Sequence, residues 1–291
     1  MKTLVIGGAG YVGSAVVQDL TSRGLKVDVC DLLLRGKPPK QDAPIYQKDY
    51  LDLSKEEIKD YDSIILLAGH SSVQMAKEDP QGALRNNLLG LQHIFDIISD
   101  QLLIFASSGS VYDGSASHKA SETDVLSPPR NVYDLTKSVG DQLAAMSDKR
   151  WVGLRFGTVN GPASMMRPEL IINRMVLDAL RLKRITLANP HAHRAILSID
   201  DLTQAVFMIL SHPSPQPGVL NLSSFNATIG SIGKTISNLF KVEIVEAPPS
   251  KTYDFSMSTA RISSLFNFIP EDDLQSIAYK LSDYLSMQER V

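Results

Sequence analysis

The sequence contains a single cysteine, Cys30, among 291 residues. One cysteine cannot form an internal disulfide, and the paired cysteines of a zinc site are missing. Cys30 lies in the apolar run VDVCDLLL, which favours a buried structural thiol over a reactive one. His191 and His193 lie two residues apart without carboxylate or cysteine partners at metal spacing, so we expect a solvated loop and no metal site.

Long apolar runs and an excess of one charge are also missing. No window of about 18 uninterrupted apolar residues is present, and no basic segment precedes an apolar one after Met1. The 29 lysines and arginines are scattered and the net charge is only −3, so we expect no nucleic-acid partner. We expect a soluble, cytoplasmic protein without a membrane partner.

Short apolar runs alternate with longer amphipathic stretches in the first half of the chain. The runs are TLVIGG, KVDVCDL, SIILLAG, LLIFASS and WVGLRFG, with helix-like segments such as 14–22 and 82–98 between them. This order is typical of β-α units that build a parallel sheet covered on both faces. The rhythm weakens after Pro162, and prolines cluster at 212–217 and 247–250. We predict an α/β fold, a doubly wound Rossmann-like parallel sheet with a smaller, interleaved C-terminal lobe.

Two glycine patterns overlap between the first apolar run and the first helix-like segment. Gly8, Gly10 and Gly13 give G-x-G-x-x-G, and Gly7, Gly10 and Gly13 give G-x-x-G-x-x-G. Glycines at such a turn allow backbone to approach a pyrophosphate, which the first-turn amides of the helix then bind. Close packing of helix on strand is the structural alternative.

Asp31 lies eighteen positions after Gly13, at the end of the second apolar run. A carboxylate there accepts hydrogen bonds from the ribose hydroxyls of NAD and repels the 2′-phosphate of NADP. A solvated turn residue is the alternative. Because Arg35 lies near enough in sequence to reach a 2′-phosphate, the pattern favours NAD without excluding NADP.

Candidate catalytic groups occur in two segments. Tyr133 and Lys137 in YDLTK are four residues apart, hence on one face of a helix, where an ammonium group would lower the pKa of the phenol. Ser108 in FASSGSVYD lies at the end of a predicted strand, where open α/β sheets place their ligands. A surface helix pair and a turn-capping serine are the structural alternatives.

Together these elements resemble the extended short-chain dehydrogenase/reductase superfamily, especially its nucleotide-sugar epimerase/dehydratase branch. Also similar are LLAG at 66–69, NNLLGL at 86–91, SSGSVY at 107–112 and LRFGTVNGP at 154–162. The resemblance implies that the glycine loop is read from Gly7. It implies NAD as cofactor, bound by Gly7, Gly10, Tyr11, Val12, Gly13, Asp31, Asp49, Tyr50, Ala68, Gly69, Asn87 and Lys137. It further implies Ser108, Tyr133 and Lys137 as catalytic residues, and Ser108, Ser110, Asn173, Arg194 and Lys251 as substrate-binding residues.

Departures from the family pattern bear on the reaction. Gly109 and Ser110 stand where the branch's dehydratases usually carry Asp-Glu, which disfavours dehydration. Lys251 stands in place of a second family arginine, which weakens the nucleotide-sugar assignment. The leading interpretation is NAD-dependent epimerisation of a nucleotide sugar through a keto intermediate, with Tyr133 as acid and base. An NAD(P)H-dependent reductase of a keto sugar or related ketone is the alternative, and a non-catalytic NAD-binding protein is a third reading.

We expect residues 1–157, with late elements from about 193–212, to form the NAD-binding domain. Residues 158–192 and 213–291 should form the substrate-binding lobe. A homodimer is expected, because the family commonly pairs the helices at 82–98 and 133–146. Their apolar residues at helical spacing could equally pack on the sheet; they are Leu84, Leu88, Leu91, Phe95, Leu135, Val139 and Leu143.

Overall fold

The computed structural model describes residues 1–38, 43–115 and 119–288, and a seven-stranded parallel sheet forms its larger half. In sheet order the strands are β11 (Gly218–Leu222), β7 (Trp151–Phe156), β5 (Leu102–Ser108), β4 (Ser63–Leu66), β1 (Lys2–Ile6), β2 (Lys26–Asp31) and β3 (Ile45–Gln47). The chain order reverses between β1 and β4, which is the switch point where doubly wound sheets bind ligands. The predicted fold class is confirmed.

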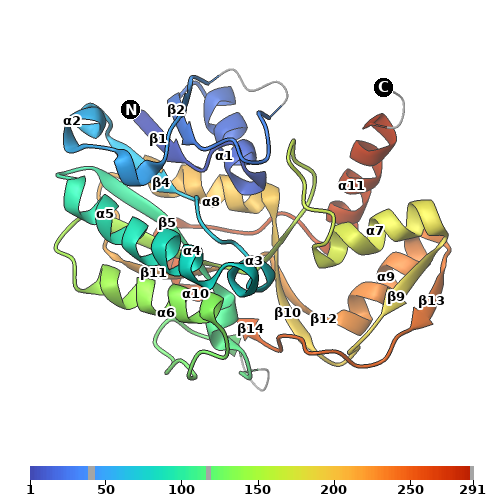
Figure 1. The fold of residues 1–291 in the computed structure, drawn as a ribbon. Helices are drawn as coiled ribbons and strands as arrows, with labels where there is room; N and C mark the ends of the chain where they lie inside the picture. Colours follow the sequence, from blue (N-terminus) through green and yellow to red (C-terminus); the bar gives the residue numbers. More distant parts are fainter. Residues whose placement is uncertain (39–42, 116–118, 289–291) are drawn as a thin grey trace.

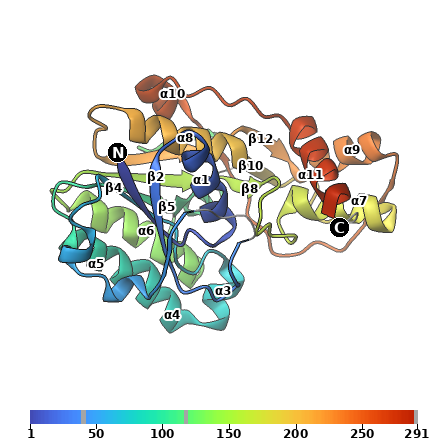
Figure 2. The ribbon, with the colours of Figure 1, turned by 90° about the horizontal axis from the view of Figure 1, so that it is seen from above.

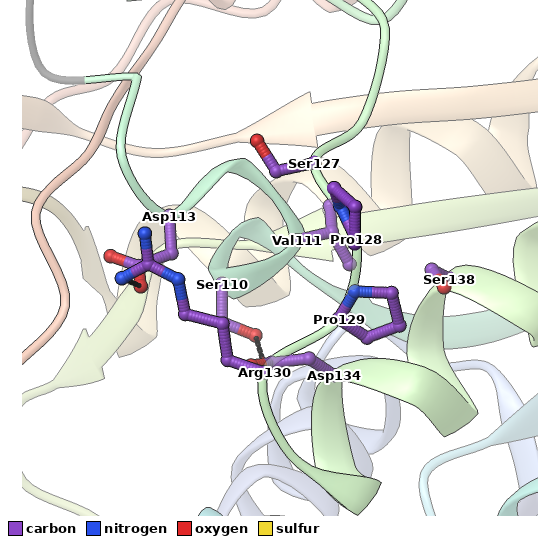
Figure 3. A pocket seen from close by; sticks show the side chains of 9 residues that line it. All are labelled: Ser110, Val111, Asp113, Ser127, Pro128, Pro129, Arg130, Asp134 and Ser138. Atoms are coloured by element: carbon purple, nitrogen blue, oxygen red, sulfur yellow. Dashed lines mark hydrogen bonds and ion pairs between the residues drawn. The ribbon is translucent and has the colours of Figure 1, made fainter.

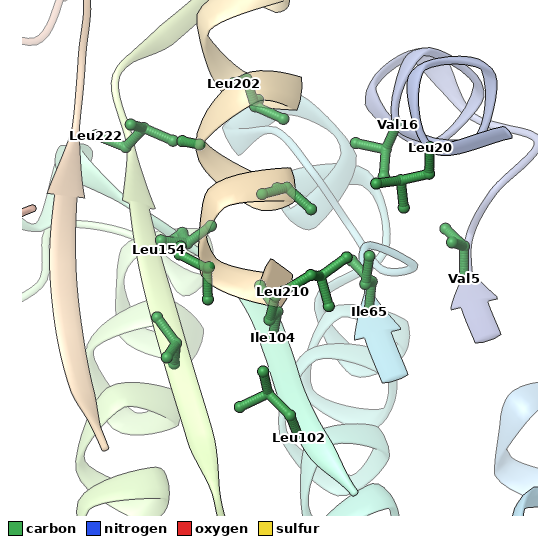
Figure 4. Packing of buried hydrophobic residues seen from close by; sticks show 14 of the residues in the cluster. Val5, Val16, Leu20, Ile65, Leu102, Ile104, Leu154, Leu202, Leu210 and Leu222 are labelled. Carbon is green, nitrogen blue, oxygen red and sulfur yellow. The ribbon is translucent and has the colours of Figure 1, made fainter. Parts of the chain in front are cut away.

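Helices cover both faces of this sheet (Figures 1 and 2). One face carries α1 (Tyr11–Ser22), α8 (Ile199–Ser211) and α10 (Ala260–Phe266), and the other carries α5 (Gly90–Ile97) and α6 (Val132–Ala145). Figure 4 shows Val16 of α1 and Leu202 of α8 directed at strand residues such as Ile65. Because both faces are covered, strands such as SIIL are buried along their whole length. Within the described ranges, no helix is both long enough and apolar enough to cross a membrane.

Shorter elements connect the β-α units. They are the 3-10 turns η1 (Tyr50–Asp52) and η3 (Gly109–Tyr112), the helices α2 (Lys55–Ile58), α3 (Val73–Glu78) and α4 (Pro80–Leu84), and a π-helical turn, η2 (Arg85–Leu89), which runs into α5. Two of these lie close to the sheet's carboxyl edge. Tyr50 of η1 packs over Gly90, and η3 directly follows β5.

The smaller lobe combines three short sheets with three helices (Figure 1). Its sheets are β12-β10-β8 (Phe225–Thr228, His193–Ser198, Thr158–Asn160), β13-β9 (Glu243–Glu246, Arg184–Leu187) and β14-β6 (Ser256–Met257, Lys119–Ala120). The helices α7 (Ile171–Leu182), α9 (Ile229–Phe240) and α11 (Leu274–Gln288) enclose their own apolar core, which includes Ile172, Ile232 and Leu281.

The pairing of some strands departs from the expected domain boundaries, as β11 and β10 show. β11 falls within the range expected for the lobe but pairs with β7 as an outer strand of the large sheet. β10 falls within the range expected for the NAD-binding domain but lies between β8 and β12 in the lobe. The prolines that precede β11 resemble a domain boundary locally, whereas the strand's place depends on pairing with a segment far back in the chain.

Candidate active site

A cavity of about 450 Å³ lies at the carboxyl ends of β1, β2 and β4. Gly7 has φ +84°, and a Cβ on it would lie 2.4 Å from the backbone nitrogen of Ala68. A Cβ on Gly13 would lie 2.1 Å from the Gly7 carbonyl oxygen, so both positions require glycine. Gly8 faces Val29 in the core, and the cavity is lined by Gly7, Gly10, Tyr11, Val12 and Gly13.

The N-terminus of α1 opens onto this cavity. The helix begins at Tyr11, and its N-cap residue, Gly10, has no side chain to bind the first-turn amides. Amides of a first helical turn that lack intrahelical partners are suited to an anion, and the helix dipole adds to that preference. The cavity therefore offers a pyrophosphate a cradle of backbone groups.

Asp31 ends β2 at the far side of the same cavity. Its carboxylate accepts hydrogen bonds from the backbone nitrogens of Ala9, at 3.0 Å, and Leu33, at 2.8 Å. Arg35 and Cys30 also line this end, and burial raises the pKa of the Cys30 thiol to about 12, as expected for a structural thiol. These two backbone bonds hold the Asp31 carboxylate at the cavity wall.

Asp49 and Tyr50 border the cavity near η1. Asp49 accepts a hydrogen bond from the Leu51 nitrogen and forms an ion pair with Arg85 at 3.3 Å. Tyr50 is only 6% exposed and donates its hydroxyl hydrogen to the Asn86 carbonyl. Its side chain therefore supports the cavity from the core side and leaves little surface for a base to stack on.

Asn87 lies behind the loop that carries Ala68 and Gly69, beside the cavity and not on its wall. Its Oδ1 accepts from the His70 nitrogen at 2.9 Å, and its Nδ2 donates to Thr136 Oγ1 at 2.9 Å. The neighbouring Asn86 lines the large cavity in its place. Asn87 thus acts on the shape of the first cavity through the Ala68–Gly69 loop that it holds in place.

A second cavity, of about 220 Å³, adjoins the first. Ala68, Gly69 and Tyr11 line both cavities. Ser108 at the end of β5 and Tyr133 and Lys137 on α6 line the second one, together with Ser110. The structure therefore brings the three expected catalytic residues together on the wall of the second cavity.

Lys137 and Tyr133 lie on one face of α6, with Lys137 Nζ 5.8 Å from the centre of the phenol ring. Nζ donates to the Ala106 carbonyl at 2.8 Å, and burial lowers the pKa of Lys137 to about 8. Burial also raises the pKa of Tyr133, although a hydrogen bond with Ser108 acts in the opposite direction. The phenol pKa is therefore raised by burial instead of lowered by Lys137 as expected, and the cation that acts to lower it is Arg167.

The residue after Ser108 has no space for a side chain. A Cβ on Gly109 would lie 2.5 Å from Met257 Sδ and 2.9 Å from the Phe255 ring. An aspartate at this position would collide with both side chains. Ser110, at the second position of the pair, carries no carboxyl group, but its hydroxyl donates to the buried Asp134 at 2.7 Å.

Comparison with known proteins agrees with this geometry. Residues 3–223 match the model of the NAD dependent epimerase/dehydratase family. The chain belongs to that family. NAD is accordingly its cofactor, and the glycine cradle and Asp31 provide groups that fit it.

Among relatives in this family, a UDP-glucose 4-epimerase from Lactobacillus helveticus is 32% identical over 177 residues, which span 56% of this chain and 53% of that protein. The structure of a UDP-glucose 4-epimerase from Thermus thermophilus in complex with NAD is 25% identical, with a TM-score of 0.82 over 98% and 99% of the two chains. An NAD-dependent NDP-hexosamine 5,6-dehydratase of tunicamycin biosynthesis, TunA, shares the fold, at 20% identity and a TM-score of 0.85 over 98% of each chain. Because one fold serves both reactions, the reaction has to be argued from the site.

Three residues expected to bind substrate in this epimerase/dehydratase chain lie away from both cavities. Asn173 is fully buried, accepting from the Gly161 nitrogen at 2.9 Å and donating to the Arg167 carbonyl at 2.9 Å. Arg194 is buried and donates to the His193 carbonyl and to Thr252 Oγ1. Lys251 is exposed on a loop. The first two side chains are used within the protein, so they do not face a ligand in this structure.

Three other residues that line the second cavity were not predicted from the sequence. Arg167, in the loop before α7, lines both cavities, and its Nη1 donates to Ser71 Oγ at 3.2 Å. Tyr253 and Phe255 come from the segment before β14. None belongs to a spaced motif, because each reaches the site only through the folding of the lobe against the large sheet.

Proposed function

We propose that the protein epimerises a nucleotide sugar by transient oxidation, with Tyr133 as the acid and base. The observation that carries the proposal is the meeting of Ser108, Tyr133 and Lys137 on the wall of the second cavity, which adjoins the glycine-lined one. When bound, NAD supplies a carbon that accepts a hydride from the sugar and returns it. The protein's own residues supply the rest of the chemistry.

In this proposal Tyr133 takes the proton of the sugar hydroxyl and later gives it back. Ser108 lies with Tyr133 on the wall of the second cavity, where its hydroxyl orients the reacting oxygen in this proposal. Lys137, held by the Ala106 carbonyl, places a cation beside the phenol.

Arg167 is proposed as a contact for the diphosphate of the substrate. It lines both cavities, and a planar guanidinium group suits phosphate oxygens. Asn173 supports it, because the Asn173 amide donates to the Arg167 carbonyl. This assignment replaces Arg194 and Lys251, neither of which lines the two cavities.

Epimerisation is favoured over dehydration by positions 109 and 110. Elimination of water needs a further acid and base at the reacting carbons. Gly109 leaves no room for one, and the Ser110 hydroxyl separates the Asp134 carboxylate from the second cavity.

The test is incubation of the purified protein with UDP- and GDP-hexoses, followed by separation of the sugar products. We expect epimers without net formation of NADH, and NAD retained by the protein as purified. A deoxy-keto sugar would instead indicate a dehydratase, and consumption of one reduced cofactor per product would indicate the reductase. The Tyr133→Phe variant serves as the control for contaminating activity.

We also propose a homodimer formed through α5 and α6. Of the apolar residues on these helices and their ends, Leu91 and Phe95 pack in the core, whereas Leu89, Leu135 and Met146 are 63%, 38% and 89% exposed. Light scattering should give twice the chain mass of 31.9 kDa, and Leu135→Glu should lower it towards the monomer value. The chain mass alone at micromolar wild-type concentration would contradict the dimer.

A further inference from the structure

Polar contacts around the second cavity are of two kinds. Some stay within the half that carries the large sheet, as Figure 3 shows for Ser110 of η3 and Asp134 of α6. Others cross from that half to the smaller lobe. At the glycine turn the crossing contact is made by Tyr11, the first residue of α1, whose hydroxyl donates to the Gly161 carbonyl at 2.7 Å. Gly161 directly follows β8, and this segment lies between α1 and α7 (Figures 1 and 2).

Tyr11 contributes to both sides of this contact. Its backbone lies in the first turn of α1, where the cavity offers a cradle for pyrophosphate, and its side chain lines both cavities. Its ring packs in a small apolar cluster with Ala163 and Ile199, and Leu170 packs against that cluster. Burial raises the pKa of Tyr11, so the hydroxyl keeps its proton and remains a donor. A ligand held at the first turn of α1 can therefore act on the loop before α7 through one side chain.

Gly161 is held on both sides of its Cα by side chains of different elements. Its carbonyl accepts from Tyr11 of α1, and its backbone nitrogen donates to Asn173 Oδ1 of α7 at 2.9 Å. Gly161 has φ +125°, and a Cβ there would lie 2.8 Å from Ile199 Cγ2, so the position requires glycine. Because glycine has more backbone freedom than any other residue, these two bonds fix a point at which the chain would otherwise bend easily.

A reciprocal pair of hydrogen bonds joins the end of β8 to the start of α7. Asn160 Oδ1 accepts from the Ile172 nitrogen at 2.9 Å, while Asn173 Oδ1 accepts from the Gly161 nitrogen. The N-cap residue of α7, Leu170, makes no side-chain cap, so Asn160 supplies a partner for one of the first-turn amides of the helix. Asn160 and Asn173 are both fully buried. The end of β8 and the start of α7 are therefore held as one unit.

The backbone of Arg167 is bound to this unit. Asn173 Nδ2 donates to the Arg167 carbonyl at 2.9 Å. The guanidinium group of Arg167 pairs with Glu169 at 2.7 Å and donates to Ser71 Oγ at 3.2 Å. Ser71 lies in the loop after β4 and lines both cavities, as Arg167 does. The hydrogen bonds thus start at the glycine turn, pass through the loop before α7 and return to the large-sheet half at Ser71.

We propose that Tyr11 is a positioning residue through which NAD at the glycine turn fixes the loop before α7. It acts through Gly161 and Asn173 on the backbone of Arg167. The use of Arg167 as a diphosphate contact rests on the proposed function, whereas the link from Tyr11 to the loop does not. With NAD bound, Tyr11 restrains the Gly161 carbonyl, and the guanidinium group is held where a diphosphate can meet it. Coupling of this kind is a free energy shared by two sites, so its effect can be measured at either one.

The first test follows backbone hydrogen exchange in the full-length protein at low and at saturating NAD. Exchange of an amide reports how often its hydrogen bond opens. In the wild type, NAD should slow exchange of the Gly161 and Ile172 amides by about 3- to 10-fold, the range that one hydrogen bond contributes. In Tyr11→Phe the amides of the glycine turn should still respond to NAD, because the backbone and the ring remain. The Gly161 and Ile172 amides of this variant should no longer respond.

Tyr284→Phe is the matched control. It removes a hydroxyl that donates to the Ala163 carbonyl at 2.8 Å in the same loop, but Tyr284 belongs to α11 and lines neither cavity. Its response to NAD should equal that of the wild type.

A second variant interrupts the link one step further along. Asn173→Leu replaces the amide by a side chain of similar size, and it should keep the response of the glycine turn and abolish that of the Ile172 amide. Combined with Tyr11→Phe it should lose nothing more, since both changes interrupt one link. Thermal unfolding shows which variants are folded. If Asn173→Leu does not fold, Tyr11→Phe decides alone, because its ring keeps the packing against Ala163 and Ile199.

The other end of the link is tested by kinetics. At saturating NAD, Tyr11→Phe should raise KM for the nucleotide sugar about 3- to 10-fold with a smaller change in kcat, because a loosened Arg167 weakens binding more than chemistry. Tyr284→Phe should change KM by less than about 2-fold, as expected for a site outside the cavities.

The outcomes separate the inference from the proposed function. If the wild type epimerises sugars but Tyr11→Phe keeps the NAD response at Gly161 and Ile172, the link is wrong and the function stands. If the wild type epimerises none, the function fails, and hydrogen exchange still decides the link. A wild-type loop that does not respond to NAD, or an equal loss of response in Tyr11→Phe and Tyr284→Phe, overturns the inference in either case.

Discussion

The two cavities differ in what forms their walls. Main-chain groups of the glycine turn are prominent in the first cavity, and side chains from several elements are prominent in the second. One wall of the glycine-lined cavity is a continuous strand-turn-helix segment, where glycines bring main-chain groups close together. The second cavity is lined by side chains from β5, α6, the loop before α7 and the segment before β14. A site made of backbone is fixed by local spacing, whereas a site made of distant side chains is fixed by the packing of the whole fold.

The largest effect is expected at Tyr133, on the wall of the second cavity. Tyr133→Phe removes the one group positioned to move the hydroxyl proton but leaves the glycine loop intact. General acid and base groups typically contribute about 10²- to 10⁴-fold, so kcat should fall by that order while NAD affinity changes little. Turnover assays and NAD titration measure both. A variant within about 3-fold of wild type, far inside that range, would show that Tyr133 is not the acid and base.

The glycine turn of the first cavity is tested by adding one methyl group at Gly13. The Cβ of Gly13→Ala would meet the Gly7 carbonyl, so the turn has to open, and we expect NAD affinity to fall by about 100-fold, equivalent to about 3 kcal/mol. Gly140→Ala on α6 is the matched helical control, since its nearest neighbour would be Leu91 Cδ2 at 3.4 Å. Calorimetry should show normal NAD affinity for the control. Equal affinities for both variants would argue against a cofactor at this loop.

Lys137 lines the second cavity, and its burial should appear as a pH dependence of stability. Its pKa falls from 10.5 to about 8 in the folded protein, so between these pH values the unfolded state binds more protons. The penalty for burying the charged amine is complete below pH 8 and is relieved as the pH rises. Relative to Lys137→Met, the wild-type free energy of unfolding should therefore increase by roughly 3 kcal/mol from pH 8 to 10.5. Denaturant titrations measure the difference, and a constant one would contradict the lowered pKa.

The smallest expected change is in the KM of a variant of Arg167, a side chain that lines both cavities. Arg167→Lys keeps the charge but loses the planar fork, so KM for the nucleotide sugar should rise about tenfold with kcat retained. Lys251→Ala, on an exposed loop outside both cavities, should leave KM unchanged. Steady-state kinetics distinguish them. If Lys251→Ala has the larger effect, the diphosphate lies towards that loop and the assignment of Arg167 is wrong.

The large sheet was predictable because most of its strands are continuous apolar runs between turn residues. β1 and β4 follow this pattern, and the glycine loop follows β1 at the expected spacing. β11 does not, because GVLNL contains an asparagine and follows three prolines. β11 joins the sheet by pairing with the free edge of β7. No local sequence pattern indicates that pairing.

The site residues divide in the same way. Ser108, Tyr133 and Lys137 were predictable, because a strand end and a helical spacing of four fix where they lie. The resemblance placed Asn173 at the ligand, but the Asn173 amide oxygen instead accepts a hydrogen bond from the Gly161 nitrogen. Arg167 escaped notice because its position at both cavities depends on how the lobe meets the sheet.

The late return of the chain to the large sheet has a consequence for synthesis. Most of the lobe's strands and α7 emerge from the ribosome before β11, so β7 is an uncovered edge of a nascent parallel sheet during that time. Unpaired strand edges promote association between chains, and contacts distant in sequence form slowly. Helix α8, which covers the same sheet, also emerges after β10. Translation speed through residues 158–217 therefore sets how long a newborn chain is exposed to wrong partners.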